Sequence, residues 1–336
     1  MYKSTQQILI TGVYRTGTEY ITQLLNNHPD LSSTMYTVNF MRFCYDRYNP
    51  IYEKKNYTKL IKETADRIKE RWNKKLDSKN IIDYCNTIKK VDYGVLYDLI
   101  MHDLFLKNST VNCWAEKTQL VWTKIPDFLN MFPNGKAIHI MRDPRSVLAS
   151  FKKYTYAPSP AYLGAIFNCF GSMKLALKYN KKYDNYKFVK YEDVMSSPEK
   201  TVIDIFKFLN LSYNHDLLSE DRWVDATGKP WGHNSAFMKN PEKKQKFDKK
   251  ESVNRWKKNL EDWEIALCEK VCGDLMGKFD YKLSDIKMDW KEYLKPVFTD
   301  DNITHFFRLW FVKGEGVEQF PTDPLKPENW TENLIK

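Results

Sequence analysis

Short apolar runs alternate along the chain with longer segments in which apolar residues recur every three or four positions. A short apolar run fits a strand that is buried on both faces of a parallel sheet, and the longer spacing fits an amphipathic helix. Strands are predicted at Gln7–Gly12, Val111–Glu116, Lys136–Met141 and Tyr186–Lys190. Helices are predicted at Thr18–Asn27, Leu120–Met131, Arg145–Tyr154, Tyr162–Tyr183 and Glu199–Leu209. The alternation predicts an α/β fold in which helices flank a central, mostly parallel sheet.

Two segments depart from this alternation. An almost purely helical insertion is predicted at about residues 57–107, and its first helix carries apolar side chains on one stripe with Lys and Arg opposite. Residues 290–336 hold four prolines and many aromatic residues, which predicts an irregular extension packed on the rest of the chain. We therefore expect one domain over residues 1–289, with the insertion inside it, and a C-terminal extension over residues 290–336.

Composition narrows the class of protein. Hydrophobic residues make up 42% of the 336 residues, which permits a sizeable core and excludes global disorder. Lys and Arg number 53 against 43 Asp and Glu, a formal net charge of +10. This excess favours anionic partners: nucleotides, sulfated or phosphorylated ligands, nucleic acid or a membrane surface. Charge alone does not choose among them.

The cysteines and the first residues bear on the compartment. The six cysteines form no Cys-x-x-Cys pair and no spacing typical of a zinc site, so no metal is expected. Cys268 and Cys272, in a helical stretch, are interpreted as small core residues. The chain starts without an apolar signal segment and contains no run of about 18 apolar residues. We expect a reduced, cytoplasmic protein without a membrane-spanning helix.

The first predicted strand leads into a loop and then a helix. A helix N-terminus in this position binds anions, because its free backbone N–H groups and the positive end of its dipole converge there. Gly12 and Gly17 have the spacing of a nucleotide-binding P-loop. Thr18, however, replaces the lysine of that loop and Glu19 its magnesium-binding Ser or Thr, which argues against nucleoside triphosphate hydrolysis. Arg15 instead offers a planar fork of donors to phosphate or sulfate, and the alternative is a surface arginine in an ordinary turn.

A second loop of this kind follows the strand at Lys136–Met141. Arg142 lies at the carboxyl end of that strand, where open α/β sheets bind their ligands. Pro144 suits the first turn of the next helix. Ser150 comes eight residues after Arg142, two turns along the same helix. One cation and one hydroxyl in this arrangement predict a second anion clamp.

Both loops, in this order, resemble the motifs of the sulfotransferases that use 3′-phosphoadenosine 5′-phosphosulfate (PAPS). Gly12–Tyr20 is similar to the 5′-phosphosulfate loop of that family, and Arg142 with Ser150 is similar to its 3′-phosphate motif, whose spacing is the same. Shorter matches are Glu116-Lys117-Thr118, Tyr191-Glu192-Asp193 and Arg255-Trp256. The resemblance covers residues 12–256 and implies a P-loop-like three-layer fold.

The resemblance also implies a role for each matching residue. Arg15 would bind the bridging phosphosulfate oxygens, Thr16, Gly17 and Thr18 the 5′-phosphate, and Arg142 and Ser150 the 3′-phosphate. Tyr20 and Tyr191 would lie near the adenine, Lys117 near the sulfuryl group, and Arg255 and Trp256 over the bound donor. The implied donor is PAPS and the product 3′,5′-adenosine bisphosphate (PAP), with no metal.

The base that would take the acceptor's proton is less apparent. The family uses a His directly after the Lys-Thr pair or a Glu soon after the first helix. Here Gln119 holds the first position, and the second lacks a carboxylate. Glu116, beside Lys117 at a strand end, is the leading candidate, with a structural ion pair as the alternative. His102 and Asp103, in the insertion, are the next candidates.

Three other titratable residues are interpreted differently. Glu19 replaces the Thr or Ser of the family, and a carboxylate there would be repelled by a phosphosulfate. We expect Glu19 to point away or to pair with a basic residue, and a direct catalytic role is the alternative. His139, within a strand, is interpreted as a core histidine, and His28 as part of a local turn.

The leading hypothesis is a sulfotransferase that moves the sulfuryl group of PAPS by in-line displacement to a hydroxyl, rather than an amine, of a glycan or small molecule. A P-loop kinase is the second hypothesis, and the missing lysine opposes it. The third is a basic, aromatic-rich protein that binds single-stranded nucleic acid, although the sequence holds no RNA-binding motif. Neither the acceptor nor the oligomeric state is readable from the sequence.

Overall fold

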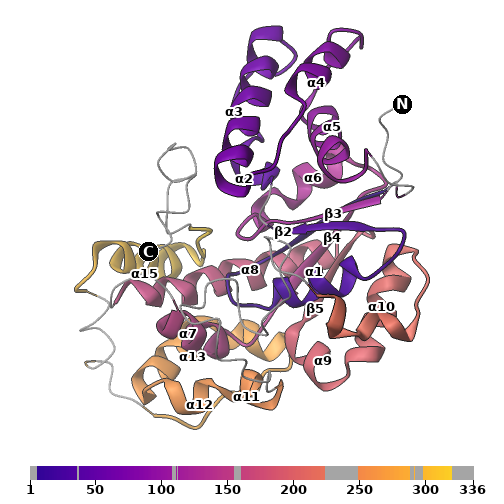
Figure 1. Cartoon of the computed structure of the whole chain (residues 1–336). Helices are drawn as coiled ribbons and strands as arrows, with labels where there is room; N and C mark the ends of the chain where they lie inside the picture. Colours follow the sequence, from indigo (N-terminus) through magenta and orange to yellow (C-terminus); the bar gives the residue numbers. More distant parts are fainter. Residues whose placement is uncertain are drawn as a thin grey trace.

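In a computed structural model of the chain, a five-stranded parallel sheet forms the centre of the molecule (Figure 1). The structure describes residues 6–35, 38–107, 111, 113–154, 160–223, 249–287, 291 and 298–319. The strands are β1 (Gln6–Gly12), β2 (Ser32–Met35), β3 (Cys113–Lys117), β4 (Lys136–Met141) and β5 (Tyr186–Lys190), in the order β2-β3-β1-β4-β5. The predicted parallel sheet and its four predicted strands are confirmed. The short β2 escapes prediction because Ser-Ser-Thr-Met contains no apolar run.

Helices cover both faces of the sheet, which gives three layers. Side chains alternate along β1, so Ile8 and Ile10 face one helical layer and Leu9 faces the other. The layer that covers Ile8 contains α1 (Thr18–Asn26), α9 (Tyr191–Ser196) and α10 (Pro198–Leu209). The opposite layer contains α6 (Ile125–Met131), α7 (Pro144–Tyr154), α8 (Gly164–Asn180) and α13 (Asp262–Lys278). The five helices predicted beside the strands are present, with ends that differ by a few residues.

The helical insertion stands at one end of the molecule (Figure 1). It contains α3 (Lys54–Trp72), α4 (Ser78–Cys85) and α5 (Tyr93–Phe105), and the short α2 (Phe40–Phe43) precedes it. Aromatic rings join it to the sheet: Tyr97 stacks on Phe40 with ring centres 4.2 Å apart and lies 4.7 Å from the Trp114 ring of β3. The segment predicted as helical at about 57–107 therefore packs on the sheet through α5.

The described part of the C-terminal region returns to the domain. α11 (Lys249–Asn254) and α12 (Trp256–Asn259) pack against α7. The segment expected to be irregular contains a helix, α15 (Asp301–Lys313), which packs on α8 through Ile303 and Phe306. The Asp300 carboxylate accepts a hydrogen bond from the Ile303 N–H at the start of α15, and Gly314, with φ of 60°, ends the helix. The rest of 290–336, beyond 291 and 298–319, lies outside the described residues.

Short 3₁₀ turns lie before or after several of the helices. The turns are Trp122–Lys124 before α6, Ala161–Leu163 before α8, and His215–Leu218 and Glu220–Arg222 after α10.

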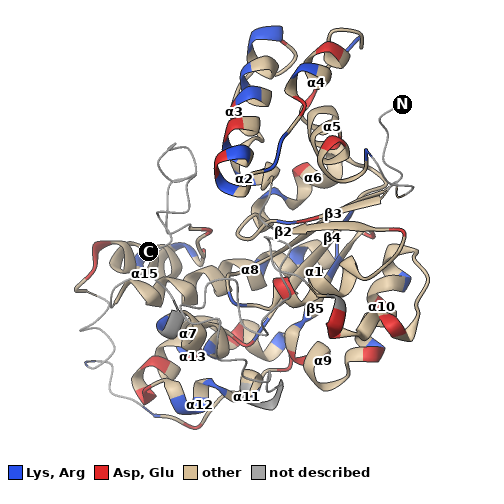
Figure 2. Ribbon diagram, in the orientation of Figure 1, with Lys and Arg blue, Asp and Glu red and all other residues tan. Residues whose placement is uncertain are grey.

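Lys and Arg lie on α3 at one end of the molecule and again around α7 and α12 at the other (Figure 2). Within the described ranges, no helix is both long and apolar enough to cross a membrane.

Candidate functional site

The loop between β1 and α1 is closely packed against β4 and α9. A Cβ atom added at Gly12 would lie 2.6 Å from the Ile140 carbonyl oxygen, and one added at Gly17 would overlap the Tyr191 ring. Gly17 also has φ of 92°, a left-handed conformation that glycine adopts without strain. It is the N-cap of α1 and offers no side-chain acceptor to the first N–H groups of that helix. The Thr16 hydroxyl donates to the Val13 carbonyl (2.7 Å) and so closes the turn. This is the arrangement in which a helix N-terminus binds an anion.

The two loops predicted to bind anions are in direct contact. Arg142 Nη1 donates a hydrogen bond to the Arg15 carbonyl oxygen (2.6 Å), and Arg15 Nε donates to Ser150 Oγ (2.9 Å). The Arg142 guanidinium also lies over the Tyr191 ring, 4.3 Å from its centre. Four residues from three segments therefore meet at the carboxyl ends of the adjacent strands β1 and β4, where the strand order places the switch point of the sheet.

Buried polar atoms around these loops have capacity left for a ligand. The buried Nε of Arg142 has no hydrogen-bond partner among the described residues. A buried guanidinium N–H in this state costs free energy unless an acceptor satisfies it. At the end of β3, Thr118 Oγ1 and Gln119 Oε1 are also buried, and the described residues supply neither with a partner. Arg142 Nε and Thr118 Oγ1 can donate hydrogen bonds to an anionic ligand, whereas Gln119 Oε1 can only accept one from a ligand hydroxyl or N–H.

α11 covers the Arg142 loop. Arg142 Nη2 donates to the Ser252 carbonyl, and the Tyr191 hydroxyl donates to Ser252 Oγ (3.0 Å). One residue further on, the Val253 carbonyl accepts from Ser146 Oγ (2.7 Å). Sequence reasoning missed Ser252, because neither its type nor its spacing marks it in a lysine-rich segment.

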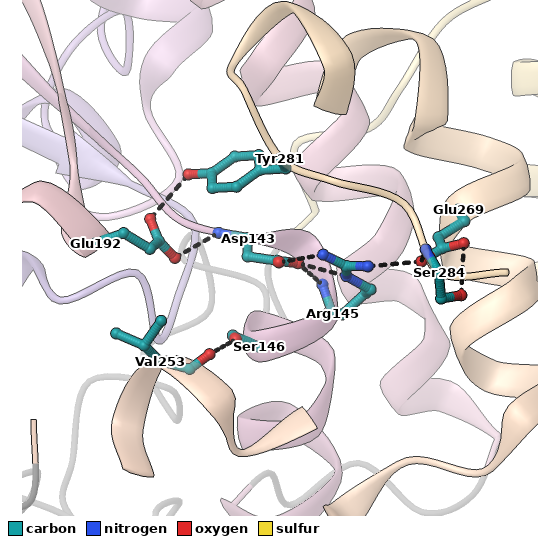
Figure 3. Close-up of polar contacts among 8 residues, drawn as sticks. All are labelled: Asp143, Arg145, Ser146, Glu192, Val253, Glu269, Tyr281 and Ser284. Atoms are coloured by element: carbon teal, nitrogen blue, oxygen red, sulfur yellow. Dashed lines mark hydrogen bonds and ion pairs between the residues drawn. The ribbon is translucent and has the colours of Figure 1, made fainter. Parts of the chain in front are cut away.

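Arg145 anchors the same loop to the C-terminal part of the domain (Figure 3). Its Nε and Nη2 donate to the Asp143 carboxylate (3.0 and 2.6 Å), and its Nη1 donates to Glu269 of α13 (2.6 Å). The Arg145 guanidinium lies over the Trp256 ring, 4.0 Å from its centre, and Arg255 precedes that residue as the N-cap of α12. The predicted Arg255–Trp256 element therefore lies beside the arginine that anchors the loop.

Glu192 holds the backbone of the loop from the other side (Figure 3). Its Oε1 accepts from the Asp143 N–H (3.0 Å) and its Oε2 from the Tyr281 hydroxyl (2.9 Å). Burial raises the pKa of the Glu192 carboxyl. In the Tyr-Glu-Asp segment, the sequence analysis assigned a role to Tyr191 alone. In the structure, Glu192 of this segment also fixes the position of the peptide after Arg142.

Lys117 and Glu19 form a pair beside the first loop. Lys117 Nζ lies 3.7 Å from Glu19 Oε1, and the lysine side chain is completely buried. Burial lowers the pKa of Lys117 to about 7; Glu19 opposes this effect and Arg15 adds to it. The expectation that Glu19 pairs with a basic residue thus agrees with the geometry. Next to this pair, Gln119 Nε2 donates to Thr18 Oγ1 (3.2 Å).

Glu116, the leading candidate for the base, faces the opposite side of the sheet from Lys117. Successive residues of a strand point to opposite faces, and Glu116 accepts from the N–H groups of Asn39 (2.5 Å) and Phe40 (3.1 Å) and from the Tyr97 hydroxyl. It is fully buried, and burial raises the pKa of its carboxyl. These contacts fit the structural alternative, in which Glu116 ties α2 and α5 to β3.

The alternative bases in the insertion also lie away from the two loops. Asp103 accepts from Lys107 (3.0 Å) and from the Asp77 N–H (2.9 Å), both within the insertion. His102 is its neighbour on α5, and burial lowers the pKa of its imidazole. The described contacts of Asp103 therefore hold the insertion together.

The two histidines interpreted as structural have hydrogen-bond partners within the protein. His139 shares hydrogen bonds with the Tyr186 hydroxyl (2.9 Å) and Ser172 Oγ (2.8 Å), and burial lowers its pKa to about 3. His28 accepts from the Asp30 N–H (3.1 Å) within its turn. Both arrangements agree with the interpretation from the sequence.

Tyr20 packs against an aromatic residue that the sequence did not single out. Its ring meets Trp223 edge to face, with centres 4.8 Å apart, and its hydroxyl donates to Glu220 (3.4 Å). Tyr20 is 6% exposed, so little of its ring is available to stack on an adenine.

The sequence and the fold were compared with known proteins. The model of the family described as "Sulfotransferase family" matches residues 7–216. The chain is similar to the solved sulfotransferase domain from the Synechococcus PCC 7002 olefin synthase, with 18% identity and a TM-score of 0.55 over 84% of this chain and 97% of that one. The sulfotransferase domain from the curacin biosynthetic pathway gives 18% identity and a TM-score of 0.51, over 82% and 98% of the two chains. No curated protein is significantly similar in sequence. Among the described residues, no group of three or more His, Cys, Asp or Glu could hold a metal ion.

Proposed function

Because the chain belongs to the sulfotransferase family, we propose that it transfers the sulfuryl group of PAPS to a hydroxyl of a glycan or small molecule. The observation that carries this proposal is the direct contact between the Arg15 and Arg142 loops. Each loop supplies a guanidinium, and their contact allows one nucleotide with phosphates on both its 3′ and 5′ sides to bind to both. We also propose residues 1–289 as the catalytic domain and residues 290–336 as its extension, which the packing of α15 on α8 supports.

The two loops would hold opposite ends of the donor. The N-terminus of α1 and Arg15 take the 5′-phosphosulfate, since backbone N–H groups and a guanidinium fork both suit tetrahedral oxyanions. Arg142, whose Nε is buried without a described partner, takes the 3′-phosphate together with Ser150. Ser150 Oγ accepts from Arg15 Nε in the structure and would exchange that contact for one with the ligand. Tyr191, against both Gly17 and Arg142, would border the adenine.

The same residues would stabilise the transition state. In-line sulfuryl transfer is similar to phosphoryl transfer, in which positioning and charge stabilisation supply most of the catalysis. Negative charge grows on the leaving 5′-phosphate as its bond to sulfur breaks. Arg15 and the α1 N–H groups interact most strongly with that growing charge, and this preference lowers the barrier. Lys117 lies at the end of the neighbouring strand β3, where its ammonium would face the transferred sulfuryl group.

Ligand-dependent thermal unfolding tests this proposal. PAP at about a hundredfold excess over its dissociation constant should stabilise the protein by about 2.7 kcal/mol, a rise in Tm on the order of 5 °C. ATP with magnesium should give a much smaller shift, since Thr18 and Glu19 replace the lysine and the magnesium ligand of a P-loop. Stabilisation by ATP and magnesium but not by PAP would instead favour a kinase. Tight binding of an oligonucleotide that weakens with salt would favour a nucleic-acid-binding protein.

A further inference from the structure

The Glu19–Lys117 pair places a partly exposed carboxylate beside the proposed sulfuryl site. Glu19 lies in the first turn of α1, directly after Thr18, and Lys117 is the last residue of β3. Their charged groups are 3.7 Å apart, with Lys117 completely buried and the Glu19 side chain 15% exposed. The carboxylate is therefore the member of the pair that a molecule entering from solvent can reach.

The other acid–base groups considered for this site are held elsewhere. Both oxygens of Glu116 accept hydrogen bonds on the opposite face of the sheet. Both oxygens of Glu192 bind the backbone and side chain of other segments, and Asp143 is paired with Arg145. His139 lies between two hydroxyl groups in the core. Among these described candidates, Glu19 alone combines a place beside the first loop with partial exposure.

We propose that Glu19 is the general base that accepts the acceptor's proton, and that the Lys117 ammonium holds its carboxylate in place. This inference rests on the proposed sulfuryl transfer, and it assigns a role to the residue that departs from the family's Thr or Ser. A carboxylate so close to a phosphosulfate would by itself be repelled. The buried ammonium 3.7 Å away compensates its charge, and Arg15 compensates that of the donor.

The proposed step moves the sulfuryl group from the 5′-phosphate oxygen of PAPS to the acceptor oxygen. The acceptor hydroxyl oxygen attacks sulfur, and a new O–S bond forms while the bond from sulfur to the 5′-phosphate oxygen breaks. The electron pair of the broken bond remains on the phosphate of PAP. The hydroxyl proton passes to the Glu19 carboxylate and from there to water, which restores the base. The products are a sulfate ester, PAP and one proton.

The charge state of Lys117 supports this arrangement. Burial lowers its pKa to about 7, so an anionic ligand nearby will favour the protonated form. Binding of the donor would therefore raise the fraction of Lys117 that is protonated beside the Glu19 carboxylate. The donor would thus strengthen the ion pair that holds Glu19 in place, and this pair is already present in the structure.

The test replaces Glu19 with Gln, which keeps the size of the side chain and removes its basicity. Two measurements are made on each protein: PAP affinity by calorimetry, and turnover of ³⁵S-labelled PAPS with water as the acceptor probe, followed as released sulfate. Loss of a general base typically costs 10²–10⁴-fold in rate. We expect Glu19→Gln to lower sulfate release at least about 10²-fold and to change PAP affinity less than about threefold. Glu19→Asp, which keeps the base on a shorter side chain, should recover part of the rate.

The matched control is Glu70→Gln on the exposed surface of α3, which should leave both measurements unchanged. Sulfate release by Glu19→Gln within threefold of the unmodified protein would overturn the inference. So would an equal loss of PAP affinity and rate, since that pattern describes a structural part of the donor loop. PAP binding without any sulfate release by the unmodified protein also contradicts a solvent-facing base. If the unmodified protein binds no PAP, the proposed function itself fails, and this outcome is distinct from the others.

Discussion

Replacement of Arg15 with alanine is expected to lower the rate of sulfuryl transfer on the order of 10²-fold or more. Arg15 would interact with the oxygen on which negative charge grows, and each charge-assisted hydrogen bond contributes roughly 1.5–3 kcal/mol. Two such bonds correspond to at least about a hundredfold in rate, since each 1.4 kcal/mol is about tenfold. The loss should appear in kcat, measured as PAP formed from saturating PAPS, more than in the affinity for PAP.

A second substitution of Arg15 separates the effect of its charge from that of its planar shape, and a variant on α15 serves as the control. Arg15→Lys keeps the positive charge but not the planar fork, so its rate should lie between those of the unmodified protein and Arg15→Ala. Arg308→Ala, on an exposed position of α15, controls for the loss of one positive charge from the whole molecule. Turnover by Arg15→Ala within threefold of the unmodified protein at saturating PAPS would contradict the role assigned to this loop.

Replacement of Arg142 with alanine should remove the contribution of the 3′-phosphate to binding. Its buried Nε is the donor that a ligand would satisfy, and Nη1 also supports the first loop through the Arg15 carbonyl. The variant should therefore bind PAP about 10²-fold more weakly, with roughly 1.5–3 kcal/mol from each charged hydrogen bond. Part of this loss will come from the first loop, which Arg142 holds in position.

A comparison of two nucleotides isolates the 3′-phosphate. Calorimetry should show that the unmodified protein binds PAP far more tightly than adenosine 5′-phosphate, which lacks the 3′-phosphate. In Arg142→Ala the difference between the two affinities should shrink strongly, because only Ser150 of the two groups assigned to the 3′-phosphate remains. An equal loss of affinity for both nucleotides would mean that Arg142 acts only as a support for the Arg15 loop.

The sheet and the two loops could be predicted because their signals are local. Strands β1, β3, β4 and β5 are short apolar runs, and the fold places their carboxyl ends on one edge. Arg142 follows β4 directly and Arg15 lies three residues after β1, so their meeting follows once β1 and β4 are neighbours. β2 could not be found in this way because its side chains are mostly polar.

The direction of individual side chains was harder to predict. Glu116 and Lys117 are adjacent, and β3 is buried on both faces, so hydrophobicity does not reveal which of them faces the first loop. The packing partners decide it: Trp114 and Glu116 face the insertion, whereas Lys117 faces α1. Without the fold, a glutamate beside the matching lysine was a reasonable but misleading candidate for the base.

Contacts with residues far away in the sequence could not be predicted from the sequence. Ser252 and Glu192 bind the Arg142 loop through a backbone carbonyl or a backbone N–H, and such contacts leave no residue pattern. α15 was missed because the prolines and aromatic residues around it suggested irregular structure, although Asp300 and Gly314 mark its two ends.

A crystal structure with PAP bound would show whether one nucleotide joins the two loops. We expect one nucleotide across the ends of β1 and β4, with Arg15 and the α1 N-terminus on its 5′-phosphate and Arg142 with Ser150 on its 3′-phosphate. A nucleotide bound elsewhere, or one that touches a single arginine while the other faces a different surface, would contradict it.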